Sequence, residues 1–133
     1  MVKYLLKKSY QHKTYKEISF KDLWGDNGVF TTMWIFGKPP KILFFKKHIK
    51  NLIKSLKIYK LNTPNLGKNI LKLIKLNIDK KKSYNHLLRV AINKEMISIS
   101  LRKRKTPKLN FNLKLISHKR FALNLKILNI TLY

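Results

Sequence analysis

Most of the charged or readily titrated side chains of this sequence, which are the first candidates for catalysis or binding, are cationic. The 133 residues include 31 Lys and Arg against five Asp and Glu and four His, and the formal net charge is +26. Cysteine is absent, which excludes a disulfide framework, a thiolate zinc site and a cysteine nucleophile. The histidines show no metal-ligand spacing, and the scattered carboxylates form no pair suited to acid–base or metal chemistry. We therefore predict no metal site and consider first the chemistry of lysine and arginine.

The densest run of cations is the segment 102–108, which also contains a proline and is expected to be a loop. Such a loop could follow a phosphate backbone, as in a small RNA-binding or ribosome-associated protein, or it could be a solvated hairpin end. The sequence has no RNP-type aromatic strand, Gly-x-x-Gly loop or zinc knuckle, so only nonspecific, salt-sensitive binding to nucleic acid is indicated. The candidate polyanion contacts are Arg102, Lys103, Arg104, Lys105 and Lys108.

The predominance of lysine over arginine weakens the argument that the positive charge serves to bind nucleic acid. Lysine supplies 27 of the 31 cations, although arginine is the better residue for bidentate phosphate and base recognition. Lysine, asparagine and isoleucine have A/T-rich codons, so an A/T-biased genome would favour this composition without selection for polyanion binding. Part of the positive charge therefore calls for no functional explanation.

Length and hydrophobicity indicate one domain that does not cross a membrane. A chain of 133 residues that is 44% apolar can bury one core, and we expect a single domain over 1–133. No stretch approaches the roughly 18 consecutive apolar residues that a transmembrane helix needs. The basic N-terminus lacks a long hydrophobic region followed by small residues, so it is a poor secretory signal. A cytoplasmic protein, or one encoded by an organelle, fits best.

Two amphipathic helices are expected in the middle of the chain. Ile42, Phe45, Ile49, Leu52, Leu56 and Tyr59 recur at helical spacing, which predicts a helix over 42–59 with lysines on its flanks. This basic helix could also bind a membrane surface, but apolar residues at such spacing more often pack in a domain core. A second helix is expected to begin with Thr63 as N-cap and Pro64 at the first helical position.

Strand-like segments lie on both sides of these helices. Short strands are expected over 2–6 and 15–20, and a buried strand over 29–36, before the turn at Gly37-Lys38-Pro39-Pro40. A hairpin is expected with arms at 87–92 and 96–101, and further extended segments over 111–116 and 121–132. The order of elements predicts an α+β fold with a mixed or antiparallel sheet and two amphipathic helices.

Three segments together resemble a known family. Gly25-Asp26-Asn27-Gly28-Val29-Phe30-Thr31-Thr32, the following Gly-Lys turn and the helix containing His48 resemble the opening of fold-type-IV enzymes, G-D-G-V-F-x-T-x-R-V, then G-K, then H-L-x-R-L-x-x-S. The strand 87–92 resembles L-R-V-x-x-T-R-G, and 125–129 resembles L-K-x-L-N. The family is that of the class IV aminotransferases, and the Phe-Thr-Thr form is closest to aminodeoxychorismate lyase.

The resemblance implies a fold, a cofactor and roles for individual residues. It implies the N-terminal domain of a class IV aminotransferase, pyridoxal 5'-phosphate (PLP) as cofactor, Lys126 as the lysine that forms a Schiff base, and Thr31 and Thr32 in the substrate pocket. In a complete family member the reaction would be elimination of pyruvate from aminodeoxychorismate to give 4-aminobenzoate, or transamination of a small amino acid. We expect His48 to have a structural role between strand and helix.

Several positions depart from the family pattern. Trp34 and Asn51 stand where the pattern has arginine, and the T-R-G turn is Asn93-Lys94-Glu95. The chain ends seven residues after Lys126, where the pattern continues into a second half. We therefore expect a truncated or split form with little activity on its small-molecule substrate alone. Its expected partner is a second copy in a homodimer or a chain that supplies the C-terminal half; a decayed remnant and a domain kept for another role are the alternatives.

Overall fold

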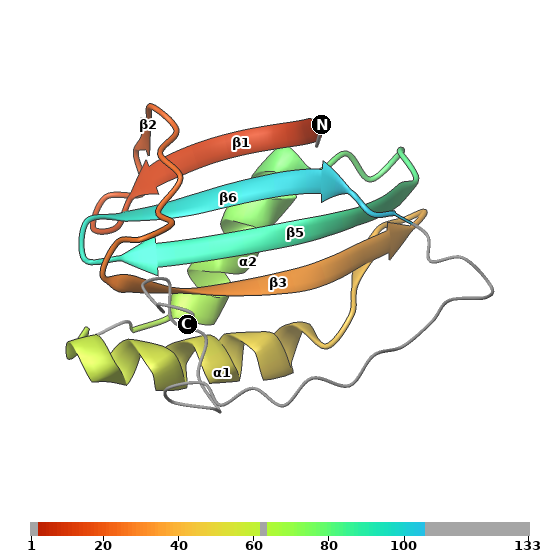
Figure 1. Ribbon diagram of the computed structural model, residues 1–133. Helices are drawn as coiled ribbons and strands as arrows, with labels where there is room; N and C mark the ends of the chain where they lie inside the picture. The colour runs from red at the N-terminus through yellow and green to blue at the C-terminus, as the bar shows by residue number, and fades with distance from the viewer. Residues whose placement is uncertain (1–2, 62–63, 106–133) are drawn as a thin grey trace, which may run out of the picture.

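The computed structural model describes residues 3–61 and 64–105, which form one antiparallel sheet with two helices packed on one of its faces (Figure 1). The sheet has six strands in the order β2-β1-β6-β5-β3-β4. This arrangement confirms the predicted α+β class with an antiparallel sheet. The elements are β1 (Tyr4–Gln11), β2 (Glu17–Ile18), β3 (Gly28–Gly37), β4 (Lys41–Ile42), α1 (Phe45–Leu56), η1 (Lys57–Tyr59), α2 (Leu66–Asn77), β5 (Tyr84–Asn93) and β6 (Met96–Lys103).

The alternation of side chains along β3 separates the two faces of the sheet. Val29, Thr31, Met33 and Ile35 are buried, whereas Phe30 and its alternate neighbours are only partly buried. Odd-numbered positions of β3 therefore face the helices, and even-numbered positions face away from them. The core lies between helices and sheet, where α1 contributes Leu52 and Leu56, α2 contributes Ile70, and β5 and β6 contribute Val90, Ile92, Ile97 and Ile99.

The first helix begins three residues later than its apolar spacing predicts. Ile42 belongs to β4, where it pairs with Ile35, and the N–H of Leu43 donates to the carbonyl of Trp34 at 2.9 Å. Backbone pairing with β3 thus keeps this segment extended, although its side chains fit a helical stripe. Phe44, with φ of 54°, makes the turn into α1, and the helix continues to Leu56 before η1.

The start of the second helix also differs from the expectation. Its N-cap is Asn65, in the left-handed region with φ of 57°, and Thr63 lies outside the described residues. Two asparagines then tie α2 to the N-terminal part of the chain. The Asn69 side chain donates to the Tyr15 hydroxyl at 2.9 Å, and the Asn77 side chain donates to the Tyr10 hydroxyl at 2.7 Å.

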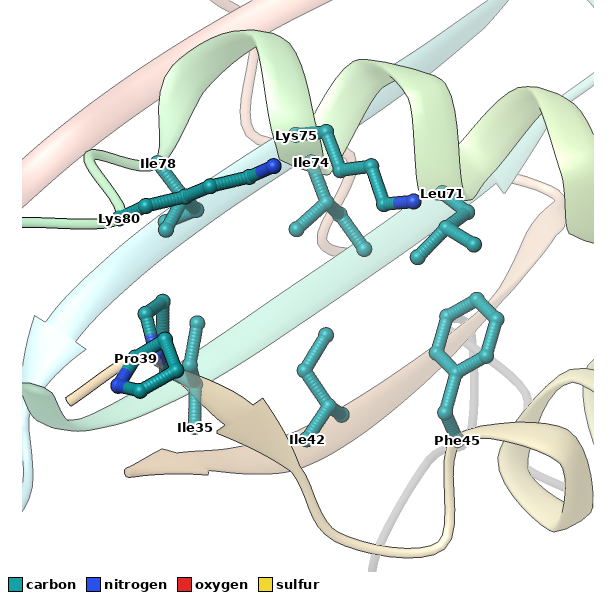
Figure 2. A pocket seen from close by; sticks show the side chains of 10 residues that line it. Ile35, Pro39, Ile42, Phe45, Leu71, Ile74, Lys75, Ile78 and Lys80 are labelled. Carbon is teal, nitrogen blue, oxygen red and sulfur yellow. The ribbon is translucent and has the colours of Figure 1, made fainter. Parts of the chain in front are cut away.

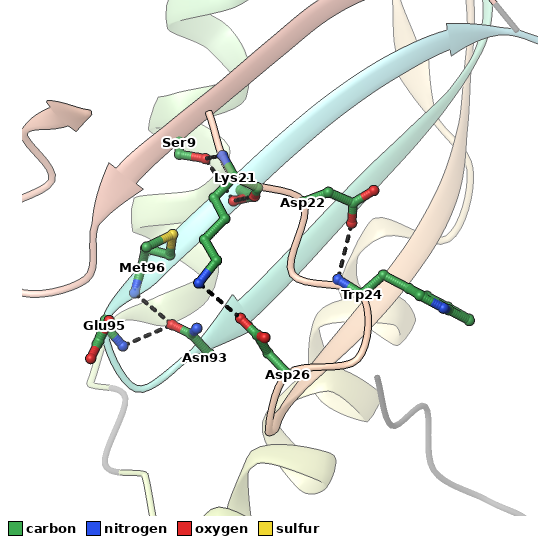
Figure 3. Close-up of polar contacts among 9 residues, drawn as sticks. Ser9, Lys21, Asp22, Trp24, Asp26, Asn93, Glu95 and Met96 are labelled. Atoms are coloured by element: carbon green, nitrogen blue, oxygen red, sulfur yellow. Dashed lines mark hydrogen bonds and ion pairs between the residues drawn. The ribbon is translucent and has the colours of Figure 1, made fainter. Parts of the chain in front are cut away.

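The predicted hairpin of β5 and β6 is confirmed, with a short turn at Lys94 and Glu95. The Asn93 side-chain oxygen accepts the backbone N–H groups of Glu95 and Met96, each at 2.8 Å (Figure 3). β6 continues to Lys103, so the expectation of a loop from residue 102 was wrong at its start. Pairing of His86 with Lys103 extends the ladder through these basic residues.

The N-terminal strands have other lengths than predicted. β1 runs from Tyr4 to Gln11 because it pairs with β6 over nearly its whole length, with an irregularity between Tyr4 and Leu6. β2 is only two residues long, since Tyr15 adopts a positive φ of 57° and turns the chain just before it. The extended segments expected over 111–116 and 121–132 lie outside the described residues.

His48 lies between strand and helix, where a structural role was expected. Its Nδ1 lies 2.8 Å from the hydroxyl of Thr31, which is 3% exposed beneath α1. This hydrogen bond joins α1 to β3 across the helix–sheet interface. It satisfies a polar pair in a layer of otherwise aliphatic contacts.

Replacing Thr31 by valine tests this contact. Thr31→Val keeps the shape of the side chain but removes the hydroxyl, so we expect the free energy of unfolding to fall by about 1 kcal/mol. Thr32→Val, on the other face of the same strand, is the matched control and is expected to change stability by less than about 0.5 kcal/mol. Urea denaturation measures both variants. Equal losses would show that the hydroxyl at 31 has no special role.

Two histidines make stability depend on pH. Burial lowers the pKa of His12, partly opposed by a hydrogen bond with the Lys94 backbone, and burial together with the Lys103 ammonium lowers the pKa of His86. The unfolded chain therefore takes up protons at these sites at a higher pH than the folded chain, near the ordinary histidine pKa of about 6.5. The folded state loses stability as the pH falls below this value.

We expect the urea midpoint of the wild-type chain to fall between about pH 7.5 and about pH 5.5. The urea midpoint should fall less in the double variant His12→Gln and His86→Gln, because this variant lacks the two histidines whose pKa values are lowered in the folded state. The comparison with wild type removes the general effect of increasing positive charge. An identical fall in both proteins would contradict the assignment.

Candidate functional site on the helix-free face

The two threonines of β3 lie on opposite faces of the sheet. Thr31 is buried under α1, whereas Thr32 is partly exposed on the face without helices. One pocket cannot be lined by both side chains, because neighbouring residues of a strand point in opposite directions. We call the side that carries Thr32 the helix-free face. Its members on the central strands are Phe30, Thr32, Trp34 and Phe36 of β3, Asn85, Leu87, Arg89 and Ala91 of β5, and Ser98, Ser100 and Arg102 of β6.

Arg89 is the central charged group of this face. The sheet register places it directly opposite Thr32 on β3 and Ser100 on β6. Its Nη1 lies 3.1 Å from Oδ1 of Asp22, and its guanidinium lies 5.8 Å from the Trp24 ring centroid. Nη2 is buried and has no hydrogen-bond acceptor in the described part of the chain. Arg89 is thus fixed by an acid and aromatic rings, and one of its buried N–H groups has no acceptor among the described residues.

The segment 19–27 crosses the helix-free face and covers one end of it (Figure 3). Leu23 is fully buried against Ala91, and the backbone N–H of Lys21 donates to the Ser9 hydroxyl at 3.0 Å. The Ser98 hydroxyl donates to the Lys21 carbonyl at 2.7 Å, so Ser9 is the donor in the 2.7 Å bond between the two hydroxyls. These bonds fasten the segment to β1 and β6.

An ion pair and a glycine conformation further shape this crossing segment. The Lys21 ammonium lies 3.6 Å from the Asp26 carboxylate (Figure 3). Gly25 has φ of +88°, a conformation that a residue with a Cβ rarely adopts, so glycine is required there. The segment therefore returns to β3 by a fixed turn and places Trp24, which is 66% exposed, beside Arg89.

Asp22 carries a stable negative charge at this site. Its partial burial acts to raise the pKa of the carboxyl. The backbone N–H of Trp24, at 3.0 Å, and the Arg89 guanidinium more than offset this effect, and the pKa lies below its ordinary value. A charged Asp22 orients Arg89 without neutralising all of its donors. The edge of the guanidinium at Nη2 thus stays without an acceptor among the described residues.

The open end of the face is aromatic and basic. Trp34 stacks on Phe36 with ring centroids 4.3 Å apart, and its indole N–H donates to the Asn85 side chain at 2.9 Å. The Arg104 guanidinium lies 4.6 Å from the Trp34 ring centroid. Position 34 has a tryptophan where the family pattern has an arginine. The guanidinium of Arg104 nevertheless lies beside this position.

The structure divides the predicted polyanion contacts between different surfaces. Arg102 and Arg104 belong to the helix-free face, whereas Lys103 pairs with His86 and points to the opposite side of the sheet. Lys105 is exposed at the end of the described chain, and Lys108 lies outside it. The alternation of β6 therefore separates cations that are consecutive in sequence. Lys126, the predicted Schiff-base lysine, also lies outside the described residues.

Two other classes of feature are absent from residues 3–61 and 64–105. No group of three histidine, aspartate or glutamate side chains there could hold a metal ion. None of the helices in these ranges is long and apolar enough to cross a membrane.

Arg89 is the candidate site residue that was not picked out from the sequence. The spacing of β5 shows an arginine inside an apolar strand, which is unusual and could have drawn attention to it. Its neighbours Asp22 and Trp24 come from a segment 67 and 65 positions away, and only the fold brings them together. This cluster therefore could not be assembled from local sequence patterns.

Comparison with known proteins identifies the family. The family model described as amino-transferase class IV matches residues 28–133, from the first residue of β3 through the hairpin and onwards. Searches of the curated proteins and of the solved structures found no match. The match covers most of the chain and includes β3, β5 and β6, the three strands that carry the helix-free face. The chain belongs to the class IV aminotransferase family.

Proposed function

We propose that the chain acts in a PLP-dependent enzyme related to aminodeoxychorismate lyase, whose acidic substrate lies on the helix-free face. Class IV aminotransferases generally depend on PLP, and the matched family supports this cofactor. The reaction proposed is the elimination of pyruvate from aminodeoxychorismate to give 4-aminobenzoate. Transamination of a small amino acid is the alternative within the same family.

The observation that carries this proposal is the unfilled donor of Arg89. A buried donor without an acceptor costs about 1–3 kcal/mol, and a carboxylate would satisfy it with a charge-assisted bond. Trp24 and Phe30 lie beside the guanidinium, at 5.8 Å and 5.4 Å from their ring centroids. The cluster therefore combines a carboxylate anchor with rings that an aromatic acid could stack against.

The donor set of this face also fits an anionic cofactor. The positions of two family arginines hold Trp34 and Asn51, so their guanidinium groups are missing. Arg104 lies over Trp34 and Arg102 projects from the same face, so a phosphate there would find two cations. In the proposed arrangement these two arginines hold the phosphate and Arg89 orients the substrate carboxylate.

Lys126 and Thr32 have separate roles in this proposal. When bound, PLP supplies an electron sink that stabilises negative charge on the substrate carbon. The Lys126 amine holds the cofactor and carries protons to and from that carbon. The Thr32 hydroxyl, opposite Arg89 in the sheet register, faces the substrate, whereas Thr31 supports β3 through His48.

In this proposal a second polypeptide chain also packs over the helix-free face. Family members are commonly homodimers. The partly exposed Trp34, Phe36 and Leu87 give this face an apolar component that a second copy, or a chain with the C-terminal half of the fold, would cover. In this proposal, residues 1–133 form one domain equivalent to the first half of a complete family member.

Trapping of the cofactor tests the role of Lys126. After incubation with less than one equivalent of PLP and reduction with borohydride, we expect one labelled peptide, containing Lys126. Lys126→Arg should lose this label because its guanidinium does not form the adduct, and the matched control Lys119→Arg should keep it. Mass spectrometry of the digest identifies the labelled lysine.

The distribution of label over the lysines decides the result. Label spread evenly over many lysines would contradict a specific cofactor site. The same preparation, assayed for pyruvate release from aminodeoxychorismate, should show no turnover above background, because Trp34 and Asn51 replace two family arginines. Rapid turnover would contradict this expectation.

A second experiment tests Arg89 directly. Titration with 4-aminobenzoate should shift the indole N–H resonance of Trp24, assigned with Trp24→Phe. Arg89→Met should weaken the apparent affinity by about tenfold or more, because it removes a charge-assisted bond. Arg89→Lys should be intermediate, since it keeps the charge without the planar fork.

Arg102→Met serves as the control, because it removes a charge from the same face away from Trp24. Amide NMR spectra establish that each variant is folded. Equal affinity of wild type and Arg89→Met would overturn the assignment of Arg89, and equal losses in the Met variants at 89 and 102 would indicate general charge attraction.

A further inference from the structure

A cavity lies on the helix-covered side of the sheet, between α2 and the β3–β4 turn (Figure 2). Its volume is about 490 Å³, within the usual range of small-molecule sites. It lies on the helix-covered side and shares no residue with the cluster of Arg89 and Thr32. Its lining is formed by Ile35, Pro39, Pro40, Ile42, Phe45, Leu71, Ile74, Lys75, Ile78 and Lys80.

The two long walls of this cavity are apolar. Ile42 and Phe45 on one side face Leu71 and Ile74 of α2 on the other (Figure 2). The late start of α1 produces this gap, because residues 41–43 stay extended against β3 and do not pack as a helical turn. The walls are therefore spaced for an inserted apolar group, and no acidic side chain lines them.

Two lysines give the cavity a cationic rim. Lys75 and Lys80 are exposed, and Figure 2 shows the Lys80 side chain extended along the gap towards Lys75. Neither is in an ion pair with an acidic side chain of residues 3–61 and 64–105. The carboxylate of Asp79, between them in sequence, accepts the backbone N–H of Lys81 at 2.9 Å. Both ammonium groups are thus available to an anion.

We infer that this cavity binds a single-chain aliphatic carboxylate, with the chain between the apolar walls and the carboxylate between Lys75 and Lys80. The apolar walls disfavour a polyanion, whose charges would lose hydration there. The cationic rim disfavours an amphiphile with a positive head. An aliphatic acid satisfies both requirements, and its site is separate from the proposed PLP site.

Calorimetric titration of the 133-residue chain with fatty acids below their micelle concentration tests the inference. Decanoate should bind with one site per chain. Affinity should rise by about fifteenfold from octanoate to decanoate, as expected for two more buried methylene groups. Decylammonium, with the same chain and the opposite charge, should bind at least tenfold more weakly than decanoate.

Paired variants separate this site from the general positive charge. Lys75→Met with Lys80→Met should weaken decanoate binding by about tenfold or more. The matched control, Lys72→Met with Lys81→Met, removes two exposed lysines near the cavity that do not line it, and should have little effect. Equal losses in the two double variants would overturn the inference.

A cavity-filling variant tests the location. Leu71→Trp should abolish decanoate binding, whereas Leu76→Trp, at a 75% exposed position of the same helix, should not. If Leu71→Trp does not melt cooperatively, Ile42→Phe replaces it. Decanoate binding retained by a folded filled variant, or seen only with micelles, would refute the site. Labelling of Lys126 by PLP should be unchanged in Leu71→Trp, so this test is independent of the proposed enzyme function.

Discussion

The full-length antiparallel pairing of β3 with β5 is the constraint on which the rest of the structure depends. It extends from Gly28 opposite Asn93 to Gly37 opposite Tyr84. Because strand side chains alternate, this single register decides which residues support the helices and which face away from them. A shift by one position would bury Arg89 under α1 and expose Val90. The aliphatic residues of both strands therefore fix the register, and the charged cluster follows from it.

The same register distinguishes one arginine from the general positive charge of the chain. Most lysines of residues 3–61 and 64–105 lie on the outer sides of the helices and in turns, where solvent screens them. Arg89 differs because Asp22 and two aromatic rings hold it in place. The proposed binding of a small acid rests on this geometry and not on the net charge. The division of Arg102 and Lys103 between opposite sides of β6 likewise argues against one continuous basic tract on that strand.

The elements with strong periodicity were predictable, and those set by distant partners were not. The buried strand β3, the hairpin of β5 and β6, and both helices follow from local spacing of apolar residues. The start of α1 was misplaced because β3 recruits residues 41–43 into the sheet, an effect absent from the helical pattern itself. The N-cap of α2 was misplaced because Asn65 adopts a left-handed conformation. The placement of Thr31 and Thr32 in one pocket did not take into account that neighbouring strand residues point to opposite faces. Arg89 could not be recognised as part of a cluster, because its partner Asp22 is distant in sequence and only the tertiary fold brings the two together.

The asparagines of this protein show how a biased composition can be put to structural use. Asn93 accepts both N–H groups of the hairpin turn, where the family pattern has glycine at position 95. Asn69 and Asn77 join α2 to two tyrosines, and Asn65 makes the turn into that helix. Asparagine, which is abundant in this sequence, thus supplies short-range hydrogen bonds in a hairpin turn and along α2. Sequence divergence of this kind can erase a family's recognisable motifs and still leave the chain with a definite fold.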